Sequence, residues 1–149
     1  MLIKDDRGYA NLCQLISNAK LQSKKTETKI SKTNLSSHSE GLIALSGCPQ
    51  GEIPSALLDS DYHAAEHIAS EYKELFGWDN FYLELQHHNL PLHETLCEKL
   101  SRLGKELNIP IVATNNVHYA SPDARMLQDI LTCIKNHTTL DKANSLLYP

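Results

Sequence analysis

The sequence has no apolar run close to the roughly 20 residues that a membrane-spanning helix requires. Its first ten residues, MLIKDDRGYA, lack the apolar stretch of a secretory signal peptide. An excess of Gly or Pro is also missing, with six of each in 149 residues, and this excludes collagenous and low-complexity chains. These absences predict a soluble, cytoplasmic protein with one hydrophobic core of ordinary size.

A surplus of basic residues is missing too. There are 14 Lys and Arg against 18 Asp and Glu, which gives a formal net charge of -4. Non-specific binding to nucleic acid depends on neutralising several phosphates with Lys and Arg. We therefore do not expect the chain to hold DNA unaided, and any DNA contact would be local or supplied by another part of a larger protein.

No C-x-x-C pair occurs among the four cysteines, so the sequence indicates neither a zinc knuckle nor a thioredoxin-type redox site. We expect four reduced thiols. Cys13, Cys97 and Cys133 lie in helical patterns and are predicted to be small core residues. Cys48 differs from them because it follows a predicted strand.

Strand and helix patterns alternate after residue 40. Short apolar runs predict strands at 41–45, 81–85 and 111–114. Apolar residues at every third or fourth position predict helices at 60–76, at 91–107 and from Ser121 onward. Such alternation requires parallel strands joined by right-handed crossovers, which predicts the α/β class. Periodicity does not separate an open sheet from a barrel.

The remaining segments are assigned from their composition. Asp5 or Asp6 can cap a first helix, and its expected buried face is Tyr9, Leu12, Cys13 and Ile16. Residues 20–40 are mostly polar and are predicted to form an exposed loop. A turn is expected around Gly51 and Pro54. The last helix is expected to bury Leu127, Ile130, Leu131 and Ile134.

Reactive side chains follow each of the three predicted strands. Cys48 follows the first strand, His87 and His88 the second, and Asn116 and His118 the third. The carboxyl ends of parallel strands meet at one edge, where α/β proteins place their chemistry. A thiolate, imidazoles and oxygen ligands from three strand ends would build a mixed-ligand site for a divalent metal. The alternative is that the thiol is a small buried group and the histidines are ordinary loop residues.

Glu84 lies inside a predicted strand among apolar neighbours. It points to the core, where an unpaired carboxylate is costly, or reaches a cation or a metal-bound water at the end of the strand, or lies on the surface of an edge strand. The sequence leaves these three interpretations open.

The segment His63-Ala64-Ala65-Glu66-His67 matches the inverted zinc-protease pattern H-x-x-E-H. The apolar face of the same predicted helix is occupied by other residues, so both histidines should face solvent. A catalytic zinc needs a third ligand and a cleft. We therefore interpret this motif as a solvated polar face and keep the protease only as a control hypothesis.

Three segments resemble the later part of the PHP (polymerase and histidinol phosphatase) domain of bacterial DNA polymerase III α subunits. They are GLIALSGCPQGEIP (41–54), FGWDNFYLELQHHNLP (76–91) and IPIVATNNVHYASPDA (109–124). The resemblance extends from about Asp5 to Leu147 and is weakest at 20–40. The form ATNNVHYA is more similar to the error-prone, translesion branch of these polymerases than to the replicative branch.

This resemblance implies a distorted barrel with divalent metals, zinc or manganese, bound at the strand ends. By position, Cys48 matches the cysteine ligand of the family and His118 matches its last histidine ligand. Asn116 stands where the family has Asp, and a neutral amide offers an oxygen but removes a negative charge, which weakens cation binding. His88 matches a recurrent histidine beside the site, and Glu84 is a second candidate near-site residue.

The early metal-binding motifs of the family would precede Met1, and the polymerase palm would follow Pro149. We therefore expect residues 1–149 to be a partial PHP domain, a fragment of a polymerase that acts in DNA replication or error-prone repair synthesis. Its metal complement should be partial or absent, and the isolated chain should be inactive.

Two functions remain open at this stage. One is a metal-dependent 3′–5′ exonuclease or phosphoesterase site that the missing part completes, and the other is a non-catalytic platform for the polymerase core with a degenerate metal site. The expected partners are DNA and other replisome subunits, contacted through the parent protein, and no membrane. The isolated chain is also expected to self-associate through unpaired strand edges.

Overall fold

The computed structural model describes residues 1–22, 29–88 and 90–143. Two compact units make up the chain, Met1–Thr114 and Asn115–Pro149. Among the helices of the described residues, none combines the length and the apolar character that crossing a membrane requires.

The first unit contains a four-stranded sheet in the order β1-β2-β3-β4. The strands are β1 (Leu2–Ile3), β2 (Leu42–Leu45), β3 (Phe81–Gln86) and β4 (Ile111–Thr114). β2, β3 and β4 are parallel, which confirms the predicted α/β alternation, and the sheet is not closed within the part of the chain that is described. β1 was not predicted, because a strand of two residues is too short to show a period, and it pairs antiparallel with β2.

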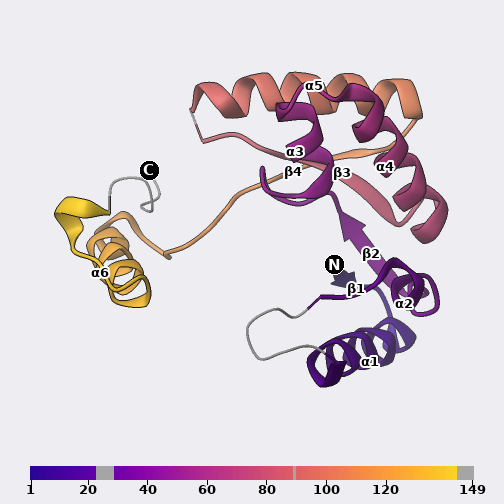
Figure 1. The fold of residues 1–149 in the computed structure, drawn as a ribbon, viewed down its shortest axis with the longest axis horizontal. Coiled ribbons are helices and arrows are strands. Elements are labelled where there is room, and N and C mark those ends of the chain that lie inside the picture. The colour runs from indigo at the N-terminus through magenta and orange to yellow at the C-terminus, as the bar shows by residue number, and fades with distance from the viewer. Residues whose placement is uncertain (23–28, 89, 144–149) are drawn as a thin grey trace. The chain divides into compact units, whose positions relative to one another are not determined.

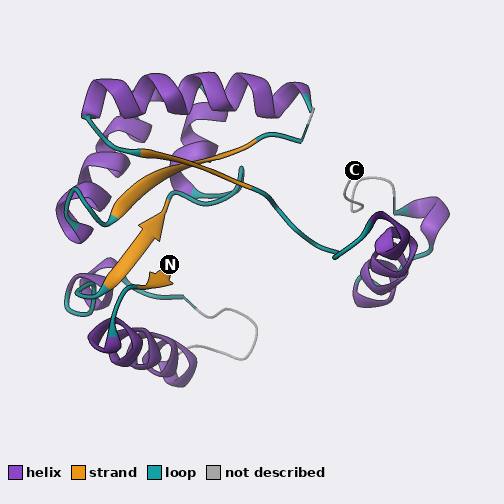
Figure 2. Ribbon diagram, turned by 180° about the vertical axis from the view of Figure 1, so that it is seen from behind, coloured by secondary structure: helices purple, strands orange, loops and turns teal. Residues whose placement is uncertain are grey.

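Helices accompany this sheet in the part of the first unit that the structure describes (Figure 2). They are α1 (Asp6–Gln22), α2 (Lys32–Ser36), α3 (Glu52–Leu58), α4 (Tyr62–Phe76) and α5 (Pro91–Leu107). In Figure 1, α5 lies above β3 and β4, and α3 and α4 pack beside it. The predictions for α4 and α5 are confirmed. The Asp61 carboxylate accepts the Ala64 N–H at 2.9 Å and caps α4, and Asn108 ends α5 in the left-handed conformation.

The turn expected near Gly51 and Pro54 is confirmed at Gly51, whose N–H donates to the Cys48 carbonyl at 2.8 Å, and wrong at Pro54, which lies in α3. Pro54 lies in the first turn of α3, where backbone N–H groups have no partner inside the helix. A proline there therefore removes no helical hydrogen bond.

Alternate residues of β2 and β3 form the centre of the core. Leu42, Ala44, Phe81 and Leu83 are buried, whereas the residues between them are half-buried. β2 was expected to be buried on both faces and is buried on only one. α5 contributes Leu96, Leu100 and Leu103 of the predicted apolar face. The rest of the cluster is Ile109, two residues before β4, and residues of the other helices: Leu15, Ile53, Leu57, Ala65, Ala69 and Phe76.

The buried face predicted for α1 is wrong except at Leu12, which is partly buried and packs against the core. Tyr9 and Ile16 are 61% and 46% exposed and Cys13 is exposed, whereas α1 buries Gly8, Leu15 and Ala19. The reason is the close approach at Gly8, where an added Cβ would lie 1.8 Å from the Gly41 carbonyl oxygen. The chain entering β2 therefore packs on the glycine side of the helix, and the stripe that starts at Tyr9 faces away.

The exposed loop predicted at 20–40 contains helical structure where it is described. α1 extends to Gln22, and α2 begins after Ser31, whose hydroxyl accepts the Asn34 N–H at 3.2 Å. Leu35 of α2 packs against the core. Residues 23–28 lie outside the described residues. The polar composition that predicted a loop thus includes Ser31, which is the N-cap of a helix.

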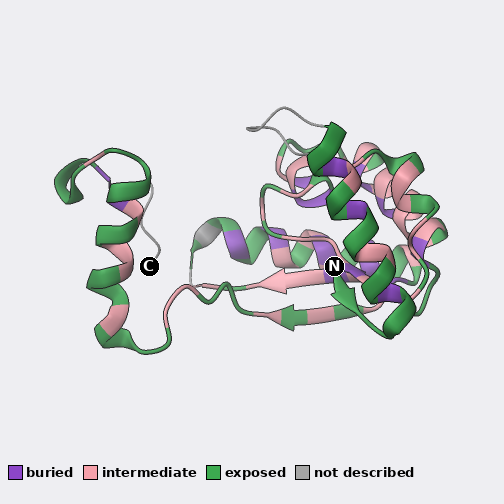
Figure 3. Cartoon of the chain, turned by 90° about the horizontal axis from the view of Figure 1, so that it is seen from below, coloured by how far each residue is buried: buried purple, intermediate pink, exposed green. Residues whose placement is uncertain are grey.

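The second unit contains η1 (Pro122–Ala124), α6 (Arg125–Lys135) and η2 (Leu140–Lys142). The helix start predicted at Ser121 is confirmed, and Cys133 is buried as expected. The predicted buried face of α6 is wrong, because Leu127, Ile130, Leu131 and Ile134 are between 40% and 65% exposed. Figure 3 shows α6 largely coloured as exposed.

Leu83 tests where the stability of the first unit resides, since its side chain is fully buried in the middle of β3. We expect Leu83→Ala to lower the free energy of unfolding by about 2–5 kcal/mol, because it leaves a cavity in the core. Urea denaturation measures this change. Leu21→Ala is the matched control, because Leu21 is 85% exposed on α1, and it should change stability by less than about 0.5 kcal/mol. Equal losses in the two variants would contradict the assignment of the core.

Candidate functional site

The end of β2 is tied to β3 by a side chain. The Glu84 N–H donates to the Ser46 hydroxyl oxygen at 2.9 Å, two residues after the Ser46 N–H donates to the Tyr82 carbonyl, also at 2.9 Å. The Ser46 hydroxyl oxygen thus accepts the N–H that a backbone carbonyl of β2 would accept in a longer ladder. The chain then leaves the sheet through Gly47, whose φ is +85°. Cys48 follows with an exposed thiol that donates to the Gln50 side-chain oxygen at 2.9 Å.

Glu84 neither enters the core nor stands alone on the surface. It alternates with buried Leu83 and is half-buried on the other face of the sheet. Its carboxylate accepts the Thr114 hydroxyl at 2.5 Å and the Gln86 amide N–H at 3.1 Å. This carboxylate therefore has two hydrogen bonds, one of them from the last residue of the neighbouring strand β4, and the cost of its partial burial is offset.

A small cavity of about 10 Å³ lies at this edge of the sheet. Cys48, Glu84, Gln86 and Cys97 are among the residues that line it. The Cys97 thiol, on α5, donates to the Gln86 carbonyl at 3.6 Å, and burial raises the pKa of this thiol. Cys97 was predicted to be only a core residue, so its position beside Cys48 and Glu84 was missed.

His88 lies against a second histidine that the sequence reasoning did not single out. The His88 backbone N–H donates to Nδ1 of His93, on α5, at 3.3 Å, and the two rings meet edge to face with centroids 5.3 Å apart. Nε2 of His88 is buried without a hydrogen-bond partner among the described residues. Burial lowers the pKa of His93, and the nearby His88 and His87 lower it further. The sequence did contain a signal for His93, because His93 and Cys97 are four residues apart and therefore lie on the same face of the helix.

The predicted ligands are divided between the two units. Cys48 and the near-site residues belong to Met1–Thr114, and Asn116 and His118 belong to Asn115–Pro149. Sulfur and carboxylate oxygen, which Cys48 and Glu84 bring to one cavity, fit part of the coordination of a borderline cation such as Zn²⁺. Over residues 1–22, 29–88 and 90–143, no group of three or more His, Cys, Asp and Glu side chains is placed to hold a metal ion.

The H-x-x-E-H motif lies on the solvent side of α4, as predicted. His63 and His67 have side chains that are 99% and 76% exposed. Their Nδ1 atoms each lie 3.8 Å from a carboxylate oxygen, that of Glu66 and that of Glu71, respectively. These are surface contacts, and histidine side chains this exposed do not lie in a cleft of the kind that a zinc protease needs.

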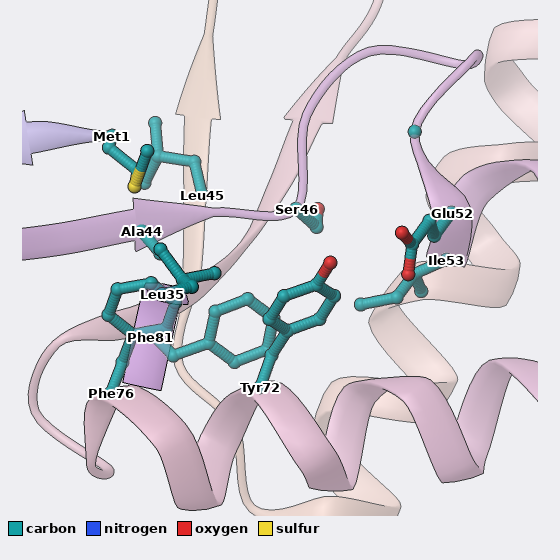
Figure 4. Close-up of a pocket in the computed structure, with 11 residues that line it drawn as sticks. Met1, Leu35, Ala44, Leu45, Ser46, Glu52, Ile53, Tyr72, Phe76 and Phe81 are labelled. Carbon is teal, nitrogen blue, oxygen red and sulfur yellow. The ribbon is translucent and has the colours of Figure 1, made fainter. Parts of the chain in front are cut away.

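A separate cavity of about 260 Å³ lies beside β2 (Figure 4). Its walls are mainly apolar and include Leu35, Ile53 and Phe81, and its polar groups are Ser46, Glu52 and Tyr72. Burial raises the pKa of Tyr72, and the neighbouring Glu52 raises it further. None of the predicted ligands or near-site residues lines this cavity.

Comparison with known proteins identifies the class of this chain. Residues 1–88 match the PHP domain family. Over 99% of its length, the chain is 37% identical to the DNA polymerase III subunit alpha of Treponema pallidum, and over its whole length it is 35% identical to that of Thermus aquaticus. An error-prone DNA polymerase from Symbiobacterium thermophilum is 35% identical over 95% of the chain.

The chain therefore belongs to the PHP domain family, and it is similar over nearly its full length to bacterial DNA polymerase III α subunits. The resemblance read from the sequence is confirmed. The chain spans 13%, 12% and 14% of the length of these three relatives, in the order given. Relatives named DNA polymerase III subunit alpha and a relative named error-prone DNA polymerase match at similar identity.

His93 makes the stability of the protein depend on pH. Because the pKa of His93 is lowered in the folded state, the unfolded chain binds its proton first, near the usual pKa of about 6.5. The stability contributed by the neutral ring is complete above that pH and is lost as the pH falls through the lowered folded pKa. We expect His93→Gln to reduce this acid-side loss in urea denaturation between pH 7 and pH 5. His63→Gln is the control, because His63 is exposed, and an unchanged pH dependence in His93→Gln would contradict the assignment.

Proposed function

We propose that this chain forms part of the PHP domain of a bacterial DNA polymerase III α subunit that acts in DNA replication or error-prone repair synthesis. The observation that carries this proposal is the 34–37% identity to such subunits over nearly the whole chain. DNA and other replisome subunits are the partners that this assignment implies, through the parent protein. The proposal assigns no polymerase chemistry to the chain itself, and the branch of the family stays open.

We propose that the open sheet is one part of a distorted barrel. β2, β3 and β4 are neighbours in sequence order and parallel, as successive strands of a βα barrel are. Their residues alternate between a face buried under the helices and a half-buried face that carries Tyr82, Glu84 and Gln86. In a barrel the second face would line the interior, with its polar residues near the carboxyl ends, where such folds place their sites.

For the site, we propose that Cys48, Asn116 and His118 bind a divalent metal, zinc or manganese, with Glu84 and His88 beside it. This proposal is supported by the position of these residues after parallel strands and by the family resemblance. When bound, such an ion supplies Lewis-acid chemistry for cleaving a terminal phosphodiester. Cys48 would contribute negative charge, whereas the neutral Asn116 would contribute an oxygen alone. Further ligands supplied by the parent protein would complete the set.

A structural platform is the second candidate function, and Asn116 favours it. The family pattern has Asp at this position, and loss of a carboxylate weakens the binding of a hard or borderline cation. In that case the domain would support the polymerase core without catalysis. The metal content of the purified chain separates the two candidates, because tight binding of a full metal complement would refute the platform.

The exonuclease proposal is tested on the full-length polymerase that contains this chain. We expect His118→Ala to abolish Mn²⁺-dependent removal of a mismatched 3′ nucleotide, because it removes a ligand of the metal. Primer extension from the matched terminus should be unaffected, and His63→Ala on the exposed side of α4 should retain the exonuclease. Unchanged removal of the mismatch in His118→Ala would refute this site.

We also propose that the isolated chain self-associates through β4. The Leu83 N–H donates to the Pro110 carbonyl at 3.0 Å, so the backbone groups of Ile111 and Ala113 point to the opposite edge of β4, where no strand of the described chain pairs. Exposed apolar edges are templates for pairing with another chain.

We expect concentration-dependent oligomers in light scattering and their reduction in Ala113→Pro, which removes an outward N–H at an edge position that tolerates proline. His63→Ser on the exposed polar side of α4 is a control that should leave the oligomers unchanged. A monomer at all concentrations would contradict this proposal.

A further inference from the structure

The exposed side of α1 carries five residues arranged symmetrically about a cysteine, namely Asp6, Tyr9, Cys13, Ile16 and Lys20. We propose that these residues, here called the α1 face, pair in antiparallel orientation with the α1 face of a second copy of the chain. The inference uses neither the proposed metal site nor the edge of β4. All five residues belong to one unit, Met1–Thr114.

The opposite side of α1 holds the helix on the first unit. Leu15 and Ala19 are buried there, and the backbone of Gly8 lies against the Gly41 carbonyl. The helix packs in this way on β1 and β2 (Figure 1). Because successive residues advance by about 100° around a helix, a helix held on this side turns the α1 face outward. The exposure of the α1 face therefore follows from the packing of the helix itself.

The two ends of the α1 face carry opposite charges at equal distances from Cys13. Asp6 lies seven residues before Cys13, in the first turn of the helix, and Lys20 lies seven residues after it, in the last turn. Between them, Tyr9 is four residues before Cys13 and Ile16 is three residues after it. Seven residues make nearly two helical turns, so these side chains project on the same side of α1.

A twofold axis at Cys13 makes this face complementary to itself. When two copies of α1 run antiparallel, Asp6 of each copy lies at the height of Lys20 of the other, and Tyr9 of each lies beside Ile16 of the other. Parallel pairing would bring Asp6 against Asp6 and Lys20 against Lys20. The charges at the two ends therefore favour a second copy of this chain as the occupant, and they favour the antiparallel orientation.

The same geometry brings the two Cys13 thiols together. Packed helices lie about 8–10 Å apart and their Cα atoms lie about 2.3 Å from each axis, so two facing Cα atoms are about 5 Å apart. A disulfide spans Cα separations of roughly 4.4–6.8 Å. Ala10 and Ser17, on either side of Cys13, are exposed and small, and they leave room for this approach.

The expected dimer is weak. One pair of helices about 25 Å long buries less surface than the roughly 1,600 Å² of a standard protein–protein interface. We therefore expect a reversible dimer whose population rises with concentration, and a covalent link is the most direct way to detect it.

Disulfide trapping of the purified 149-residue chain tests the pairing. Diamide takes up one hydrogen from each of two adjacent thiols, which form a disulfide while diamide is reduced to the hydrazine. We expect Cys13–Cys13 links several-fold more often than links through Cys48, read by peptide mass spectrometry. Cys48 is the internal reference because its thiol is also exposed. Links through Cys48 that are as frequent as those through Cys13 would overturn the pairing.

Charge reversal separates the pairing from an effect on the helix alone. Light scattering in the Ala113→Pro background measures the dimer without association through β4. We expect Asp6→Lys and Lys20→Glu each to weaken the dimer several-fold, and the double variant to restore it. Both changes oppose the helix dipole, so an effect on α1 alone would make the double variant the weakest dimer and would overturn the pairing.

Glu74→Lys is the matched control, since it reverses a charge at an exposed position of α4 and should leave the dimer unchanged. Circular dichroism identifies any variant that fails to fold, and disulfide trapping of the wild-type chain then still decides the question.

The remaining outcomes distinguish this inference from the proposals above. A monomer at every concentration in Ala113→Pro would overturn the α1 pairing and leave the association through β4 intact. Alkylation of Cys13 in the full-length polymerase tests for another occupant. Protection of Cys13 there, with no Cys13–Cys13 link in the isolated chain, would assign the α1 face to another part of the polymerase and overturn the pairing.

Discussion

The hydrogen bond from the Thr114 hydroxyl to the Glu84 carboxylate is the contact on which the carboxyl edge of this protein depends. A carboxylate in a half-buried strand position is costly unless its lone pairs are used. Here the cost is offset by two side chains, and one of them belongs to a neighbouring strand. Glu84 lies in an otherwise apolar strand because its carboxylate joins β3 to β4 at the point where the backbone hydrogen bonds between these strands end.

The carboxyl edge of the sheet has few free acidic groups, although the family to which the chain belongs is expected to bind metal there. A PHP-type metal site depends on carboxylates and thiolates to balance a divalent cation. In this chain Asn116 is a neutral amide, and Glu84, which lines the same cavity as Cys48, is already engaged by Thr114 and Gln86. In the proposed metal site, affinity would therefore depend strongly on Cys48 and on how rigidly its turn is held.

Elements with a clear period were predictable from the sequence, and contacts between distant residues were not. α4, α5 and the three parallel strands follow from repeated apolar positions within one segment. The buried side of α1 was mispredicted, since Gly8 carries no apolar side chain and its close approach to Gly41 depends on a residue 33 positions away. Likewise, the strand ends identified Cys48, but Ser46, Thr114 and His93 join the site only through partners brought near by the fold.

The exposed apolar stripes have a physical meaning that follows from this comparison. The sequence spaces Tyr9, Cys13 and Ile16 on α1, and Leu127, Ile130 and Ile134 on α6, as helices space their core residues, yet the structure leaves them exposed. Apolar surface of this regularity is seldom left in water, because burying it stabilises the protein by about 25 cal/mol per Å². The spacing of the apolar residues on α1 and α6 thus indicates that these residues are buried, but the contacts in the described part of the chain do not bury them. The outward backbone N–H and C=O groups of β4 likewise have no strand partner in the described chain. The exposed helix stripes and this strand edge together favour an assembly larger than the open sheet.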